Sequence, residues 1–249
     1  MGERGMEDPY FKLDRTIHHP SHKVPVLTWW AGIYDHVFIV LHPFFRVPGF
    51  IGLGSKPFPS DDLIKSSGQA VPWSEVHRAV APKEPRDTFY RAAWLLSVLG
   101  YAERANIDLQ TRIENYCARE SLFLPQEYGL APILEPTVGN FLARLGSSSV
   151  IAWDEFRENS IELELSTFDR SQPHFRLPRS ITSNRIWGLH NREKGVLLTW
   201  EFDSTDALIA LTTDALSITR PEEFFEGWYA DEKTYCDVLN PPEFIRRES

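Results

Sequence analysis

The sequence predicts an α+β protein: a mainly helical first half that follows an N-terminal strand, packed with an antiparallel sheet and one helix in the second half. A change of periodicity indicates this class. Apolar residues recur at helical spacing from about 60 to 146, whereas "SIELELS" at 160–166 alternates apolar and polar residues strictly. Apolar residues are 42% and aromatic residues 13% of the 249 residues, which is enough to bury a sizeable core.

The first strand is expected at "HVFIVLHPFF" (36–45), a run of β-branched and aromatic residues that Pro43 interrupts. A loop rich in glycine and proline follows. Ser60 then precedes "DDLIKSS" as an expected N-cap with acidic residues in the first turn. A second short helix is expected at 73–80, ending before Pro82.

Three longer helices complete the first half. We expect one at 88–99, with Asp87 as its N-cap and Gly100 as its stop. Another is expected at 107–120. The last is expected at 136–146, where a proline stands in the first turn and a glycine at the C-terminal end.

In the second half, "RIWGLH" and "GVLLTWEFD" flank the short turn "NREK", which predicts an antiparallel hairpin. The stretch "STDALIALTTDAL" (204–216) predicts a helix with Ser204 or Thr205 as its N-cap and an apolar stripe. "EFFEGWYAD" (223–231) predicts one more strand of the same sheet.

We expect a single globular unit over 1–249. A helix-rich part (24–146) and a strand-rich part (150–241) are a possible subdivision. Residues 1–23 carry charge and a histidine cluster without a sustained period, which indicates an arm on the surface.

Charge and cysteine content exclude several classes of function. With 26 Lys and Arg against 35 Asp and Glu, the formal charge of −9 repels phosphate backbones and anionic membranes and attracts basic partners. Nucleic-acid and membrane binding are therefore not expected. Cys117 and Cys236 lack CxxC spacing, so they predict neither a disulfide framework nor a cysteine-rich zinc site. Because no signal-peptide or membrane-spanning stretch is present, we expect a soluble, cytoplasmic protein.

The first candidate site is "IHHPSH", where His18, His19 and His22 crowd together. Imidazoles are common ligands of transition metals, so these three residues are metal-ligand candidates. Pro20 disfavours the regular helix that would place two of them on one face, and no HExxH motif occurs. A polar arm without metal is the favoured interpretation, and no cofactor is specified.

The second candidate site is a group of carboxylates at the ends of predicted strands: Glu201, Asp203, Glu226 and Asp231. If the strands are neighbours, these groups could converge to bind a divalent cation or to carry acid and base catalysis. The alternative is that Asp203 caps the next helix and Asp231 lies in a solvated turn. No nucleophile elbow and no phosphate loop occurs in the sequence.

The third candidate is a binding surface in which aromatic residues stand beside acids. Its members are Trp228, Tyr229, Asp231, Glu232 and Asp237. Such a composition is typical of interface hot spots. The alternative is that the two aromatic residues pack in the core.

Three stretches carry a resemblance to a known family: "LHPFFRVPGF", "PFPSDDLIKSSGQAVPWSEV" and "FFEGWYADEKTYCDVL". In this order they resemble an uncharacterised bacterial family, catalogued as a domain of unknown function, with Bacillus members of similar length. The resemblance implies a bacterial protein of one module. It implies no activity and no catalytic residues.

The leading hypothesis is a binding protein without catalysis, conceivably of the immunity or antitoxin type, that covers the active surface of a basic protein partner. The alternative is a metal-assisted hydrolase that uses the four carboxylates with a histidine from the first half. A third possibility is a regulatory protein that binds a small metabolite between its two halves. The oligomeric state stays open.

Overall fold

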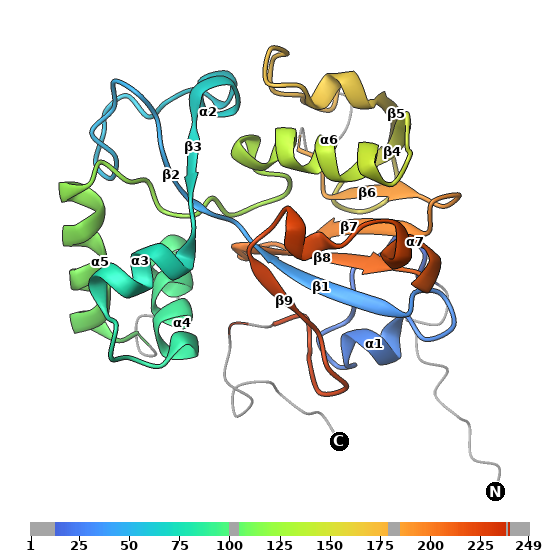
Figure 1. The fold of residues 1–249 in the computed structure, drawn as a ribbon, viewed down its shortest axis with the longest axis horizontal. Coiled ribbons are helices and arrows are strands. Elements are labelled where there is room, and N and C mark those ends of the chain that lie inside the picture. The colour runs from blue at the N-terminus through green and yellow to red at the C-terminus, as the bar shows by residue number, and fades with distance from the viewer. Residues whose placement is uncertain (1–12, 100–104, 179–184, 238, 240–249) are drawn as a thin grey trace, which may run out of the picture.

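A computed structural model describes residues 13–99, 105–178, 185–237 and 239. A seven-stranded sheet is its centre, with the strand order β5-β4-β6-β7-β8-β1-β9 and every neighbouring pair antiparallel (Figure 1). The strands are β1 (His36–Leu41), β4 (Ser149–Trp153), β5 (Ser160–Glu164), β6 (Gly188–Asn191), β7 (Val196–Trp200), β8 (Asp206–Leu211) and β9 (Gly227–Tyr229). The α+β prediction is confirmed.

The helices lie mostly in the first half of the chain. They are α1 (Val26–Trp29), α2 (Asp61–Ser67), α3 (Trp73–Val80), α4 (Arg86–Ser97), α5 (Ile107–Arg119), α6 (Glu135–Arg144) and α7 (Thr213–Ile218). A second, two-stranded sheet joins β2 (Phe44–Arg46) to β3 (Gln69–Val71), and short 3₁₀ turns occupy Pro132–Leu134, Leu165–Phe168 and Pro221–Glu223. In Figure 1, α3, α4 and α5 stand together to one side of the large sheet.

Both faces of the large sheet are covered. Phe38 and Val40 of β1 pack in the core that includes residues of α6, while Val37 and Ile39 pack with Trp30 at the end of α1. This alternation is the period of two that a strand imposes on its side chains. Helices α3, α4 and α5 enclose a third apolar cluster of their own.

Covering on both faces explains the main error of the sequence analysis. The stretch predicted as a helix over 204–216 is strand β8 followed by the short helix α7, whose N-cap is Thr212. Every residue of β8 is buried, with Ile209 and Leu208 in cores on opposite faces. A strand buried on both faces is a continuous apolar run, which periodicity does not separate from a buried helix.

Other boundaries agree with the sequence or differ by a few residues. The Ser60 hydroxyl accepts the backbone N–H of Leu63, so Ser60 caps α2 as predicted. Asp87 is not a cap, because α4 begins at Arg86 and Pro85 occupies the N-cap position. Gly100, the expected stop of α4, lies outside the described residues. The last predicted strand is real but shorter, since only β9 pairs with β1.

The hairpin prediction is confirmed, since β6 and β7 pair antiparallel across the "NREK" turn. The helices expected at 107–120 and 136–146 are confirmed as α5 and α6. Within the described parts of the chain, no helix combines the length and the apolar character needed to cross a membrane.

Candidate functional site

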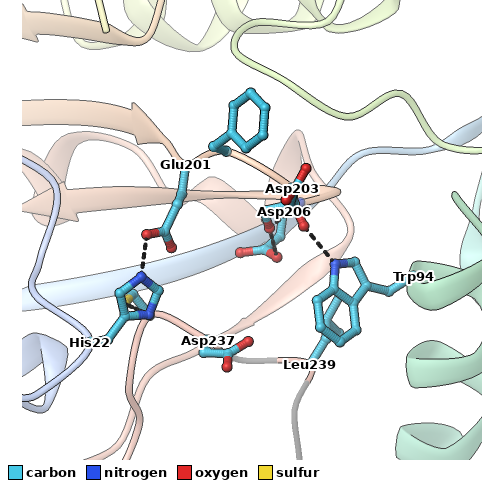
Figure 2. A pocket seen from close by; sticks show the side chains of 10 residues that line it. His22, Trp94, Glu201, Asp203, Asp206, Asp237 and Leu239 are labelled. Carbon is cyan, nitrogen blue, oxygen red and sulfur yellow. Dashed lines mark hydrogen bonds and ion pairs between the residues drawn. The ribbon is translucent and has the colours of Figure 1, made fainter. Parts of the chain in front are cut away.

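Glu201 follows β7, the central strand of the large sheet, and its carboxylate meets two of the predicted histidines. His22 Nε2 lies 2.6 Å from Glu201 Oε1, and His19 Nε2 lies 3.4 Å from Oε2. Figure 2 shows the contact between His22 and Glu201. The structure therefore brings together a carboxylate and two imidazoles that the sequence analysis placed in separate candidate sites.

The segment that carries these histidines is fixed to the rest of the molecule just before them. The Trp30 indole N–H donates to the carbonyl of Arg15 over 2.8 Å, and the Tyr34 hydroxyl donates to the carbonyl of Thr16 over 2.9 Å. Ile17 is buried. These contacts hold the backbone of residues 15–17, directly before the histidines.

Arg157 ties the same segment to the sheet. Its Nε donates to the carbonyl of Ile17 over 3.0 Å, and Nη2 donates to the carbonyl of Trp187 and to Thr199 Oγ1, each over 2.7 Å. Nη1 donates to the carbonyls of Asp154 and Glu155. Burial lowers the pKa of this guanidinium to about 10, so it stays charged at neutral pH.

A fourth donor comes from the C-terminal end of the described chain. The thiol of Cys236 is buried, and its Sγ lies 3.4 Å from His22 Nδ1. One donor atom each from His19, Glu201 and Cys236 lies within 4.8 Å of the others. Both ring nitrogens of His19 are buried; Nε2 has the ion-pair contact with Glu201, and Nδ1 has no hydrogen-bond partner among the described residues. This cluster of His19, Glu201 and Cys236, with His22 beside it, is named the donor cluster below.

The charges of the donor cluster interact strongly. Burial would raise the pKa of Glu201, but His19 and His22 outweigh it and hold that pKa at about 2. The hydrogen bond that His22 donates to Glu201 raises the pKa of His22. Burial raises the pKa of the Cys236 thiol, and the negative charges of Glu201 and Asp237 raise it further. The metal-free site therefore pairs an ionised carboxylate with a protonated thiol.

Asp206 lies beside the donor cluster. Because Trp200 pairs with Ala207, Glu201 and Asp206 occupy the same end of the β7–β8 pair. The Asp206 carboxyl accepts a hydrogen bond from the Ser204 hydroxyl and is 6% exposed. Burial raises its pKa to about 7, with further contributions from Glu201 and Asp237. Near neutral pH this group can therefore both donate and accept a proton.

Apart from His19, the donor cluster and Asp206 line a cavity of about 280 Å³, named the acidic cavity (Figure 2). Its lining residues are His22, Trp94, Glu201, Phe202, Asp203, Ser204, Asp206, Cys236, Asp237 and Leu239. Four carboxylates in one small space attract cations. The backbone carbonyl of Asp203 accepts the indole N–H of Trp94 over 2.9 Å, and this bond joins two residues that line the cavity.

Two predicted carboxylates have other partners. Glu226 accepts the backbone N–H groups of Trp73 over 2.5 Å and of Ser74 over 2.8 Å, so it caps the N-terminus of α3. Asp231 is exposed and accepts the Lys233 N–H and the Thr234 hydroxyl in its own turn. The structure thus places Glu226 and Asp231 in structural contacts rather than beside Glu201.

The predicted binding surface is divided in the same way. The Trp228 ring lies 6.3 Å from Tyr90, with the Arg86 guanidinium 5.6 Å from its centre. Tyr229 packs edge-on against Phe38 at 5.0 Å and donates its hydroxyl proton to the carboxylate of Glu222. Glu232 is exposed. Asp237 lines the acidic cavity.

Sequence reasoning missed the donor cluster as a unit because its members come from three distant segments. His18, the third predicted histidine, instead donates from Nδ1 to the carbonyl of Asp14 over 2.8 Å. In the sequence analysis, Cys236 is treated only as a cysteine without CxxC spacing. No spacing rule links positions 19, 201 and 236. The one available signal was that Glu201 stands at the end of a predicted strand and His19 in a cluster of histidines.

Comparisons with known proteins identify a family and nothing more specific. No curated protein and no solved structure matches the chain. A family model matches residues 22–238, a span that includes His22, Glu201 and Cys236 but not His19. The chain accordingly belongs to the family described as Protein of unknown function (DUF2711).

Proposed function

We propose that this protein is a zinc-dependent hydrolase whose metal ion is held by His19, Glu201 and Cys236. One observation carries the proposal: an imidazole, a carboxylate and a thiol have donor atoms within 4.8 Å of one another beside a cavity. Zn²⁺ prefers these nitrogen, oxygen and sulfur donors. Three protein ligands leave a fourth position for water, which is typical of catalytic rather than structural zinc sites.

His22 is suited to hold two of these ligands in place. Its Nε2 contacts the Glu201 carboxylate at 2.6 Å and its Nδ1 lies 3.4 Å from the Cys236 sulfur. Hydrogen-bonding partners of this kind orient metal ligands, and their loss typically weakens metal binding by about 10- to 100-fold. His22 is therefore proposed as a positioning residue.

The charge balance also favours a cation. Glu201, Asp206 and Asp237 lie close enough to the Cys236 thiol to raise its pKa. A divalent ion would offset these negative charges and stabilise the thiolate, which is the form of cysteine that binds metal. Metal binding should then release the thiol proton.

The chemistry that follows is the hydrolysis of a carboxylic ester or amide. Bound zinc lowers the pKa of water to about 7 and polarises the substrate carbonyl. The water oxygen forms a bond to the carbonyl carbon, and the bond from that carbon to the leaving oxygen or nitrogen breaks. The leaving atom takes a proton from Asp206, which recovers one from the attacking water.

Zinc titration of the metal-free protein by calorimetry tests the metal site. We expect one ion per chain, with binding at least about 100-fold weaker in His19→Ala and in Cys236→Ser. His36→Ala is the matched control, because His36 pairs with Leu211 at the opposite end of the sheet from Asp206. Cobalt in place of zinc should give a thiolate charge-transfer band that Cys236→Ser abolishes. Unchanged zinc affinity in both ligand variants would overturn the site.

The catalytic part is tested with the zinc-loaded protein and a panel of p-nitrophenyl esters and p-nitroanilides. We expect hydrolysis that a chelator abolishes and zinc restores. Asp206→Asn should lower kcat by about 100-fold with little change in zinc affinity, since general acid catalysis contributes about 10²- to 10⁴-fold. Tight zinc binding without hydrolysis of any member would contradict the hydrolase and leave only a metal-binding protein.

A basic protein partner stays a prediction, and it rests on the formal charge of −9. The contacts of Trp228 and Tyr229 with Tyr90 and Phe38 give it no added support. A pull-down in which zinc-loaded protein retains a basic partner would revive it.

A further inference from the structure

A second cavity, named the aromatic cavity, shares Glu201 and Phe202 with the acidic cavity. Its volume is about 330 Å³, and His19 also lines it. Five aromatic side chains line it: Trp29, Phe156, Trp187, Trp200 and Phe202. Small-ligand sites begin at about 300 Å³, and aromatic side chains are common in their lining. The donor cluster therefore stands between a cavity lined by carboxylates and one lined by aromatic rings.

The floor of the aromatic cavity is rigid. Trp29, Trp187 and Trp200 are each at most 5% exposed, so neighbouring side chains fix their rings. The Trp200 indole N–H donates to His42 Nε2 over 3.0 Å. Walls that are already ordered lose little conformational entropy when a ligand enters, and this favours binding.

The rim of the aromatic cavity is exposed. Phe156, in the turn between β4 and β5, and Phe202, which follows β7, are each 56% exposed. The Phe202 ring stacks on Trp187 with centroids 6.3 Å apart and an interplanar angle of 16°. A flat apolar ligand entering beside these two rings would remove their apolar surface from water, which is favourable.

The polar groups of the aromatic cavity decide against an anionic ligand. Arg157 lines it, but each of its three nitrogens donates to protein oxygen atoms. A guanidinium has five N–H donors, and five such bonds use all of them. A free carboxylate would therefore meet Glu155 and Glu201 without an unused N–H donor of Arg157. A neutral aromatic ring meets no such penalty.

We infer that the substrate carries an aromatic acyl group, whose ring enters the aromatic cavity while its carbonyl carbon lies beside Glu201. This inference rests on the proposed hydrolase, because the same donor cluster would hold the zinc ion. The reaction is the hydrolysis of an ester or amide of an aromatic carboxylic acid. Water supplies the oxygen of the released acid, and the bond to the leaving alcohol or amine breaks as that group gains a proton.

Two hydroxamates with the same zinc-binding head and different side groups test the inference on zinc-loaded protein. Calorimetry should show benzohydroxamate binding at least about tenfold more tightly than acetohydroxamate, because only the former has a ring to bury. Phe156→Ala and Phe202→Ala should reduce this ratio to about threefold or less without weakening acetohydroxamate. Phe58→Ala is the matched control, since Phe58 is 55% exposed and lines neither cavity.

Metal-free protein separates this inference from the proposed hydrolase. Benzamide should change the tryptophan fluorescence saturably, acetamide should not, and Phe202→Ala should remove the benzamide effect. That result with no zinc binding would support the aromatic cavity while the hydrolase fails. Equal binding of the two hydroxamates to zinc-loaded protein, with no benzamide binding, would overturn the aromatic acyl substrate and leave the zinc site standing.

Discussion

Two clusters of ionisable groups, one fully buried and one partly exposed beside two cavities, differ in whether protein atoms occupy all of their bonding positions. In the first, Lys65 Nζ lies 2.7 Å from Glu135 Oε2 and donates to the carbonyls of Thr167 and Pro173. His174 Nδ1 contacts the other oxygen of Glu135, and the Lys65 and Glu135 side chains are 0% exposed. In the donor cluster, by contrast, His19 Nδ1 has neither a hydrogen-bond partner nor an ion-pair partner among the described residues.

This difference helps to distinguish charged groups that stabilise the fold from charged groups that are suited to bind a ligand. Lys65 has three donors and three acceptors around it, so its cluster is complete without a ligand. The donor cluster borders two cavities and concentrates acids around a thiol. A saturated buried pair contributes to the fold, whereas an unsaturated one at a cavity is suited to bind something.

The cluster of Lys65, Glu135 and His174 is named the closed cluster below. Removing one of its members should have the largest effect on the free energy of unfolding. Lys65→Met removes the lysine from the buried Glu135 carboxylate, which keeps only its contact with His174 among the partners named above. We expect a loss of about 3–5 kcal/mol in the free energy of unfolding. Urea denaturation measures it. Lys65→Met combined with Glu135→Leu should recover at least half of the loss, because apolar replacement of a buried pair is often neutral. If the free energy of unfolding of Lys65→Met lay within about 1 kcal/mol of the wild-type value, the closed cluster would not be needed for the stability of the fold.

A buried histidine outside both clusters sharpens the comparison through pH. His42 is fully buried, donates from Nδ1 to the carbonyl of Gln126 and accepts the Trp200 indole N–H at Nε2. Burial lowers its pKa to about 4. The unfolded chain, with a histidine pKa of about 6.5, therefore binds the proton more readily. Its contribution to stability is fully present above pH 6.5 and is lost as the pH falls toward 4, by about 3 kcal/mol in all.

His42→Asn keeps an amide donor near Nδ1 but does not titrate. Urea denaturation between pH 4 and 7 should therefore show a smaller decline toward low pH in this variant than in the wild type. Parallel curves for the two proteins would contradict the assignment of the pH dependence to His42.

A substitution in the donor cluster should change the affinity for a metal ion rather than the free energy of unfolding. Glu201→Gln keeps the shape of the side chain but removes the negative charge, and we expect zinc affinity to fall about 100-fold, or about 2.8 kcal/mol. Lys65→Met, where folded, should bind zinc as the wild type does. If Glu201→Gln bound zinc with wild-type affinity, the contrast between the two clusters would collapse.

The smallest effect is expected at the carboxylate that caps a helix. Glu226→Gln removes the charge that accepts the first N–H groups of α3, at a cost of about 1 kcal/mol in the free energy of unfolding. Zinc affinity should not change. A hundredfold fall in zinc affinity in this variant would return Glu226 to the functional site.

Much of the fold could be predicted because local periodicity determined it. Ser60 as a cap, the β6–β7 hairpin and α5 follow from short-range patterns. The error at β8 arose because burial on both faces removes the alternation that marks a strand. Glu226 could not be recognised as a cap, since the helix that it caps lies far away in the sequence.

The candidate site was predictable residue by residue but not as an arrangement. His19, His22 and Glu201 were each singled out by residue type and position. Their meeting depends on Arg157, which links the segment before the histidines to the sheet through the carbonyl of Ile17. Cys236 joins them only because the chain returns past β9 to the same end of the sheet. Such long-range contacts leave no period in a sequence.

The convergence of His19 and Cys236 gives a bound ion a topological role. A metal ion bridging positions 19 and 236 would close nearly the whole described chain into one ring, as a disulfide between the same positions would. Such a closure restricts the unfolded chain more than a local site does, because the entropy lost grows with the length of the loop. A zinc ion bound there would then also stabilise the folded chain, and its removal would lower the free energy of unfolding.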